Sequence, residues 1–388
     1  MEASKKRNQI FQYLEAIGIL MVIDDHTGTT VGIMSGLFPY NSFYMPMFVF
    51  ISGYFYREQS VLKNVGHKAR HLLLPYLLWG GIGNLIAWIM MRMRIVNCYT
   101  PLSFKTILSS LTIVSLSPLT DPSWFVVMLF WVAVVYNLLH IILRIKARWM
   151  DYAFSVVSVI IGFGLIYLCM NGYAYNLYVL FFVRTFWYMQ FYHAGVMFHR
   201  YWEKRVSKWP TLLSCTVFVM INAALLCVFG DSIRFNSTAW MASFHSWWLP
   251  VVTSITGILF WYKVMQFLSD KIGQLKAVDY IAENTFTIMC THFFFSKIPD
   301  FYAYFQSLHG NAAFADFPAE AFQQNIWNGY GRYATSLLSF FTGVFGSFLV
   351  VWIMQRAAKL FVHETGGARP QCRQPNVNLR LVARRMIS

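Results

Sequence analysis

Apolar stretches long enough to cross a lipid bilayer recur along almost the whole chain. A membrane-spanning helix needs about 20 mostly apolar residues, and about ten segments of this sequence meet that requirement. The expected spans are 9–26, 37–56, 71–91, 123–143, 153–170, 177–198, 210–229, 246–268, 278–296 and 334–355.

The composition supports a membrane protein and argues against the other broad classes. Of the 388 residues, 57% are hydrophobic and 12% are charged, whereas about 25% of the residues of a soluble domain are charged. A soluble globule of this length has no interior large enough for so much apolar surface, and disorder requires low hydrophobicity. The predicted fold is therefore all-α: a polytopic transmembrane helical bundle.

Basic residues are distributed unevenly between the two sides of this bundle. If the N-terminus is cytoplasmic, 24 of the 31 lysines and arginines fall in inner connections and six in outer ones. Such a bias follows the positive-inside rule, and it predicts that both termini are cytoplasmic and that the number of spans is even. The net charge of +15 therefore indicates cytoplasmic loops and not a nucleic-acid partner.

The segments outside the spans differ in character. Residues 1–365 are predicted to form the transmembrane domain, and 366–388 a basic, disordered cytoplasmic tail. The stretch 102–117 predicts an amphipathic surface helix, and 299–333 is the longest polar connection. Residues 1–7 are polar and basic, and no small-residue cleavage site follows the first span, so no cleavable signal peptide is expected.

Ionisable residues inside the spans mark the candidate site, because each costs about 2.5–3.5 kcal/mol at the centre of a span. The first span carries Glu15 and ends in Asp24, Asp25 and His26. Glu15 and His26 are eleven residues apart in the sequence, so they share one helix face at about 16 Å along the axis. The acidic cluster is also compatible with a simple exposed helix end.

Two further spans carry charge or histidine at the same depth as this cluster. Arg184 lies in the outer half of the sixth span and His292 in the outer half of the ninth. Arg184 cannot lose its proton, so it requires a carboxylate, a cage of carbonyl groups or an anionic ligand. A buried pair with Asp24 or Asp25 and direct contact with a ligand both satisfy this requirement.

Motifs of soluble enzymes are absent from the sequence. There is no phosphate-binding loop, no Gly-x-Ser-x-Gly, no His-Glu-x-x-His and no dinucleotide fingerprint. The six cysteines form no Cys-x-x-Cys pair, so neither disulfides nor a metal site are expected.

Five short features follow one another in a characteristic order between residues 10 and 295. They are a first span that ends in His26, a proline-containing run that ends in Ser-Gly-aromatic (43–56), a basic stretch before a Pro-aromatic pair (68–76), a Trp-Phe pair at the start of the fourth span (124–125), and a Ser/Thr-aromatic run that ends in His292 (285–292). In this order they resemble the acyltransferase-3 family of integral membrane acyltransferases, which includes bacterial polysaccharide O-acetyltransferases.

One position departs from the family pattern. The family usually has a basic residue, most often arginine, eleven residues before the first-span histidine, and this chain has Glu15 there. A carboxylate cannot hold a phosphate or another carboxylate as arginine does. Either another cation has taken over the task, or the chemistry of this member differs or is lost.

The resemblance implies an O-acyltransferase of the bacterial cytoplasmic membrane, without a bound cofactor or metal. It would move an acyl group, expected to be acetyl, from cytoplasmic acyl-CoA to a hydroxyl of a surface or lipid-linked glycan. This reaction needs a base for the hydroxyl and a partner for the oxyanion. The expected catalytic residues are His26 as base, Asp24 or Asp25 to orient it, and His292 as a second acid, base or transient acyl acceptor. The expected substrate-binding residues are Arg184, Tyr44, Glu15, Trp124, Lys68 and Arg70. Arg184 or Tyr44 would stabilise the developing negative charge. Lys68 and Arg70 would contact the CoA phosphates.

Two alternative functions remain open from the sequence. An exporter or translocator of a glycan or lipid-linked sugar would use the same intramembrane charges as its path, although no inverted repeat relates the two halves. A histidine-dependent membrane-bound O-acyltransferase of the unrelated type would rest on His140 alone. The route of the acyl group also stays open, because the pantetheine arm could thread the bundle or an acyl-enzyme could form.

Overall fold

The computed structural model describes residues 2–27, 43–112, 115–172, 177–233, 235, 244–329 and 333–364. Over these residues the chain is helical and contains no strand. Six of the helical segments are long and apolar enough to cross a membrane: Val61–Arg92, Pro118–Ile142, Arg148–Met170, Thr211–Phe229, Leu249–Ile272 and Thr335–Ala357. The all-helical membrane bundle is therefore confirmed, whereas the larger number of spans stays a prediction.

The elements follow the expected segments closely. The first half contains α1 (Glu2–Thr27), α3 (Tyr44–Tyr54), α4 (Val61–Lys68), η2 (Ala69–Leu73), α5 (Leu74–Arg92), α6 (Phe104–Ser110), η3 (Pro118–Ser123), α7 (Trp124–Ile142), α8 (Arg148–Met170) and α9 (Leu177–Met197). The second half contains η5 (Phe198–Trp202), α10 (Glu203–Val206), α11 (Thr211–Phe229), η6 (Gly230–Ile233), α12 (Leu249–Ile272), α13 (Lys276–Glu283), α14 (Thr285–Ser296), α15 (Ile298–Leu308), η8 (Ala312–Phe314), α16 (Ala319–Gln324) and α17 (Tyr333–Glu364).

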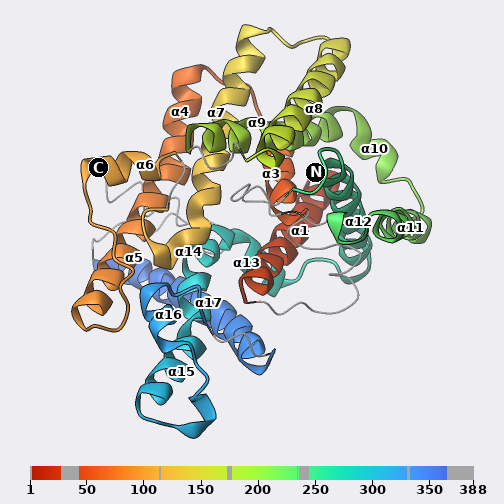
Figure 1. Cartoon of the computed structure of the whole chain (residues 1–388). Coiled ribbons are helices and arrows are strands. Elements are labelled where there is room, and N and C mark those ends of the chain that lie inside the picture. The colour runs from red at the N-terminus through yellow and green to blue at the C-terminus, as the bar shows by residue number, and fades with distance from the viewer. Residues whose placement is uncertain are drawn as a thin grey trace.

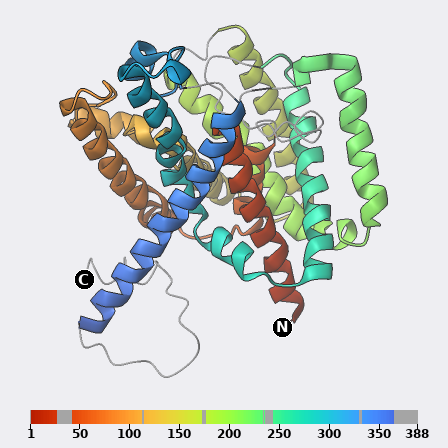
Figure 2. The same cartoon turned by 90° about the horizontal axis from the view of Figure 1, so that it is seen from below.

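Helix α1 lies inside the bundle and packs against α3, α12, α13, α14 and α17 (Figure 1). The N-terminal end of α1 and the C-terminal end of α17 lie at the same end of the bundle, and α15 and α16 lie at the opposite end (Figure 2). This placement is the one that an even number of crossings requires, while the side of the membrane on which the termini lie remains a prediction.

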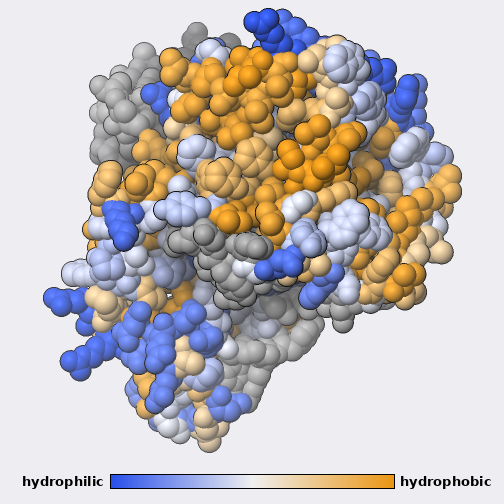
Figure 3. Space-filling view, turned by 45° about the horizontal axis from the view of Figure 1, so that its top comes forward, coloured by the Kyte–Doolittle hydropathy of each residue, from blue (hydrophilic) through white to orange (hydrophobic). Residues whose placement is uncertain are grey.

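The outer surface of the bundle is largely apolar. Figure 3 shows a broad hydrophobic area over the bundle and hydrophilic residues gathered on the lobe that contains α15 and α16. Helices α8 and α11 expose large apolar side chains, among them Ile160, Leu212 and Met220. A surface of this size and polarity fits a lipid environment and not water.

Three expected segments differ from what the structure shows. The single span expected over 278–296 is instead two helices, α13 and α14, with a break at Asn284, whose side-chain amide donates to the carbonyl oxygen of Tyr280 at 2.7 Å. An asparagine that bonds to the preceding turn competes with the helical ladder, so it ends α13. Of the expected surface helix at 102–117, the structure shows α6 as helical, and residues 113 and 114 lie outside the described part of the chain. The polar connection at 299–333 is largely folded, because it contains most of α15 together with η8 and α16.

Two other predictions reach beyond the described residues. The span expected over 37–56 is represented by α3, and 37–42 are outside the part of the chain that the structure describes. The tail at 366–388 also lies outside it.

Helices α3 and α9 cross with their backbones in direct contact. A Cβ atom on Gly195 would overlap the carbonyl oxygen of Phe50, and one on Gly53 would overlap the carbonyl oxygen of Tyr192. Lipid gives helices no hydrophobic reason to associate, so small residues that permit such close approach are what hold membrane helices together. The crossing at Gly53 and Gly195 therefore fixes α3 against α9.

We expect Gly195→Ala to weaken the folded protein strongly, because the added methyl group has no space and must push α3 away from α9. Overpacking of this kind costs about 1–3 kcal/mol or more. Gly164→Ala on α8 is the control, since a Cβ there meets no atom within 4 Å. Thermal unfolding of the purified protein in detergent checks both variants, and equal melting temperatures would contradict the proposed contact.

The topology is tested with reporter fusions. A fusion after Arg57 should report the cytoplasm and a fusion after Gly172 the outside, because the basic residues follow the positive-inside rule. An alkaline phosphatase and fluorescent protein pair reads both sides. The same side for both fusions would disprove the predicted topology.

Candidate active site

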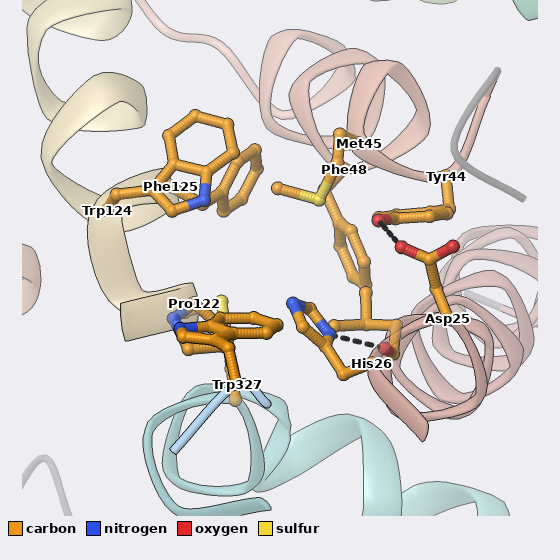
Figure 4. Close-up of a pocket in the computed structure, with 11 residues that line it drawn as sticks. Asp25, His26, Tyr44, Met45, Phe48, Pro122, Trp124, Phe125 and Trp327 are labelled. Atoms are coloured by element: carbon orange, nitrogen blue, oxygen red, sulfur yellow. Dashed lines mark hydrogen bonds between the residues drawn. The ribbon is translucent and has the colours of Figure 1, made fainter. Parts of the chain in front are cut away.

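A cavity of about 180 Å³ lies where α1, α3, α7 and α14 meet, at the end of the bundle that carries α15 and α16. Pockets that enclose a drug-sized ligand have about 300–1,000 Å³, so this cavity accommodates a single ring or an acyl end. Its lining residues are Val22, Asp25, His26, Tyr44, Met45, Phe48, Pro122, Trp124, Phe125, Met289 and Trp327. Figure 4 shows Asp25 and Tyr44 on one side, Trp124 and Trp327 on the other, and His26 between them.

His26 enters the cavity from the last turn of α1. Its Nδ1 lies 2.6 Å from the carbonyl oxygen of Val22, one turn earlier (Figure 4). A carbonyl oxygen only accepts hydrogen bonds, so Nδ1 is the donor in this contact, and Nε2 is the nitrogen left for other partners. The helix backbone thus orients the ring. The sequence analysis had instead expected Asp24 or Asp25 to orient it.

His292 lies directly behind His26 on α14. The two ring centroids are 5.2 Å apart, with the rings at 60°. The Nδ1 of His292 contacts the carbonyl oxygen of Ile288 at 3.0 Å, so this ring also presents Nε2 as an acceptor. His292 is fully buried, and its Nε2 has no hydrogen-bond partner among the described residues. Two predicted site histidines, 266 residues apart in the sequence, therefore meet in space.

The carboxylates of the first span take different positions. Asp25 is exposed on the cavity wall and accepts a hydrogen bond from the Tyr44 hydroxyl at 2.9 Å. Asp24 is buried and does not line the cavity. Glu15 is half-buried three turns earlier on α1, too far along the helix to line the cavity. Of these three, only Asp25 reaches a substrate held next to His26.

Arg184 lies behind the wall of the cavity and does not line it. Its guanidinium carbon is 4.4 Å from the centroid of the Trp124 ring, and its side chain is 6% exposed. A cation over an indole is attracted by the negative face of the ring, more strongly when both are desolvated. Arg184 therefore holds Trp124 in place, and its predicted ion pair with Asp24 or Asp25 stays a prediction.

Lys68 and Arg70 lie far from the cavity. They belong to the helical segment that continues into α5, and twelve residues separate Lys68 from Gly80, which is about 18 Å of helix. Gly80 packs on Leu116, in the segment that leads to Pro122 at the cavity. The two basic residues are thus at the opposite end of the bundle from His26.

A second polar cluster at that opposite end was missed by the sequence analysis. Buried Asp151 forms an ion pair with Arg200 at 3.1 Å and accepts from Tyr201 at 2.6 Å. His140, also buried, lies 2.7 Å from the Glu58 carboxylate. Asp151 and Glu58 stand near the ends of apolar runs, where charge is usual, and nothing in the sequence indicates that they are paired.

Several lining residues were not among the predicted site residues, and Trp327 is the one that comes from a polar connection. It comes from the connection after α16, and its ring centroid lies 5.8 Å from that of His26. An aromatic residue in a polar connection is an ordinary feature of a sequence, so no signal distinguished it. No group of three or more metal-ligating side chains occurs in the described part of the chain.

Comparison with known protein families yields one match that covers nearly the whole chain. The model of the acyltransferase-3 family, an acyltransferase domain, matches residues 8–356. Comparisons with curated proteins and with solved structures gave no match. The matched range contains every residue of the cavity, and the protein belongs to the acyltransferase-3 family of membrane acyltransferases.

Proposed function

We propose that this protein transfers an acetyl group from acetyl-CoA to a hydroxyl of a surface or lipid-linked glycan, in the bacterial cytoplasmic membrane. The observation that carries the proposal is the contact of two imidazoles, His26 in the lining of the cavity and His292 buried against it. The Nδ1 of each ring contacts a carbonyl oxygen of its own helix, so the Nε2 of His26 is the nitrogen that can accept a proton from a substrate in the proposed reaction.

In the proposed step the Nε2 of His26 takes the proton of the acceptor hydroxyl, and the oxygen of that hydroxyl attacks the thioester carbonyl carbon. The new C–O bond forms, the C–S bond breaks, and the thiolate leaves with the proton that the imidazolium returns. The products are the acetyl ester and free CoA. Buried His292 lies against His26 and provides a second proton acceptor next to the reacting groups.

Tyr44 supports the negative charge that develops on the carbonyl oxygen. Its hydroxyl lies across the cavity from Trp124 and donates a hydrogen bond to Asp25. The phenolic hydroxyl can donate this hydrogen bond to an oxyanion instead. A charged oxygen is a stronger acceptor than the carbonyl oxygen of the bound thioester. Arg184 acts only through Trp124 in this scheme.

The donor reaches the cavity from the opposite end of the bundle. Lys68 and Arg70 lie at that end, where they contact the CoA phosphates in our proposal. A thioester on the pantetheine arm must then extend along the bundle toward His26, or the acyl group passes through an acyl-enzyme.

His26→Gln should lower acetylation by about 100-fold or more. Glutamine is similar in size to histidine and can form hydrogen bonds, but its amide does not accept a proton as a base. Acetate released by mild alkali from surface glycans measures the activity in cells that carry each variant. His309→Gln is the matched control, since His309 makes the same bond to its own helix, to Phe305 at 2.7 Å, on an exposed turn away from the cavity. Normal acetate from His26→Gln would refute the role of His26 as base.

Tyr44→Phe should lower acetylation by about 100-fold if its hydroxyl stabilises the oxyanion, which is the usual cost of losing one such donor. Tyr13→Phe on α1 is the control, because it removes a hydroxyl of the same kind that donates to Gly273 at 2.8 Å, outside the cavity. Equal acetate levels in the two variants would assign the oxyanion to another donor.

A further inference from the structure

Trp327 stands at the mouth of the cavity although it belongs to none of the membrane helices. Its side chain is 42% exposed, and its ring centroid lies 5.8 Å from that of His26 and 4.4 Å from that of buried Phe293. An indole that lines the cavity and keeps this exposure leaves an apolar surface open there. That open surface is available to a ligand.

Hydrogen bonds and close packing connect the segment that carries Trp327 to its neighbours. The side-chain oxygen of Asn325 accepts from the backbone N–H of Trp327 at 3.0 Å, and Asn328 donates to the carbonyl of Ala321 at 3.2 Å. Gly329 packs so closely on Asp300 that a Cβ atom would overlap the carboxylate. Asp300 is itself paired with Lys297 at 3.1 Å.

A lysine also lies close to the ring of Trp327. The Lys297 ammonium lies 5.9 Å from its centroid and 5.5 Å from that of Phe293, within the range of cation–π attraction. Phe293 follows His292 directly and Lys297 lies five residues after it, so the same stretch of chain carries the second histidine and the partners of the indole. These contacts and the hydrogen bonds of its connection place Trp327 against His26.

The cavity combines two flat apolar walls with a polar edge. Trp124 and Trp327 provide the apolar walls, and His26, Asp25 and Tyr44 provide the polar side (Figure 4). A pyranose ring has the same two properties, because its C–H face is apolar and its rim carries hydroxyls. An electron-rich indole face attracts the slightly positive C–H bonds of such a ring, and the cavity volume suits one ring.

We propose that Trp327 is the acceptor-stacking residue: a pyranose of the acceptor packs on its exposed face and so places one ring hydroxyl at Nε2 of His26. This inference rests on the proposed function and deepens it, because it assigns the recognition of the acceptor sugar to Trp327, in the connection after α16.

The test uses cells that lack the protein and are complemented with full-length variants. The probe is the acetate that mild alkali releases from their surface glycans. Trp327→Ala should lower this acetate by about tenfold or more, since aromatic stacking of this kind is worth about one factor of ten. Trp327→Phe, which keeps a flat ring, should retain clearly more acetate than Trp327→Leu, which fills space without one.

Trp352→Ala is the matched control, because Trp352 is an exposed tryptophan of α17 next to Arg356 and away from the cavity. The membrane level and melting temperature of each variant separate lost binding from lost folding. Acetate near the wild-type level in Trp327→Ala overturns the inference, as do equal losses in the Phe and Leu variants, or losses that only follow a lower melting temperature.

The same experiment separates this inference from the proposed function. No difference in acetate between cells with and without the wild-type protein would overturn the function itself, and the stacking role with it. Loss of acetate in His26→Gln together with full acetate in Trp327→Ala would leave the function standing and refute the stacking residue alone.

Discussion

Close backbone contact between helices is the constraint on which this bundle depends. Lipid is as apolar as the side chains, so helices associate through van der Waals contact at small residues. The α3–α9 crossing at Gly53 and Gly195 is one such contact. On the other side of α1, Gly343 and Gly346 of α17 pack directly on α14, against Ser296 and Phe295. These crossings hold α3 and α14 in place around the last turn of α1, and the cavity is the space that remains.

Within that space the helix backbone prepares the chemistry. Both His26 and His292 use one nitrogen to bond the carbonyl one turn earlier, and a rigid helix is a more constant partner than an exposed carboxylate. In our proposal this contact leaves the Nε2 of His26 to accept a proton from a substrate in the cavity.

The two ends of the bundle have different chemistry. The end with His26 has two adjacent imidazoles and aromatic walls, whereas the other end carries ion pairs such as Asp151 with Arg200 and the basic residues Lys68 and Arg70. In our proposal this division matches a reaction whose donor is anionic and enters on one side, and whose acceptor is an uncharged hydroxyl on the other.

The sequence by itself determined the helical class and singled out the two histidines. Long apolar runs have only helices available to them in a membrane, and ionisable residues within such runs stand out because each is costly; His26 and His292 were found in this way. Only the tertiary structure decided which residues meet. In the folded chain His292 on α14 contacts His26, and Trp124 lies between Arg184 and the cavity. Trp327, from a polar connection, lines the same cavity. Periodicity and hydropathy describe one segment at a time, whereas these contacts depend on crossings between helices distant in the chain, set by close packing at a few small residues.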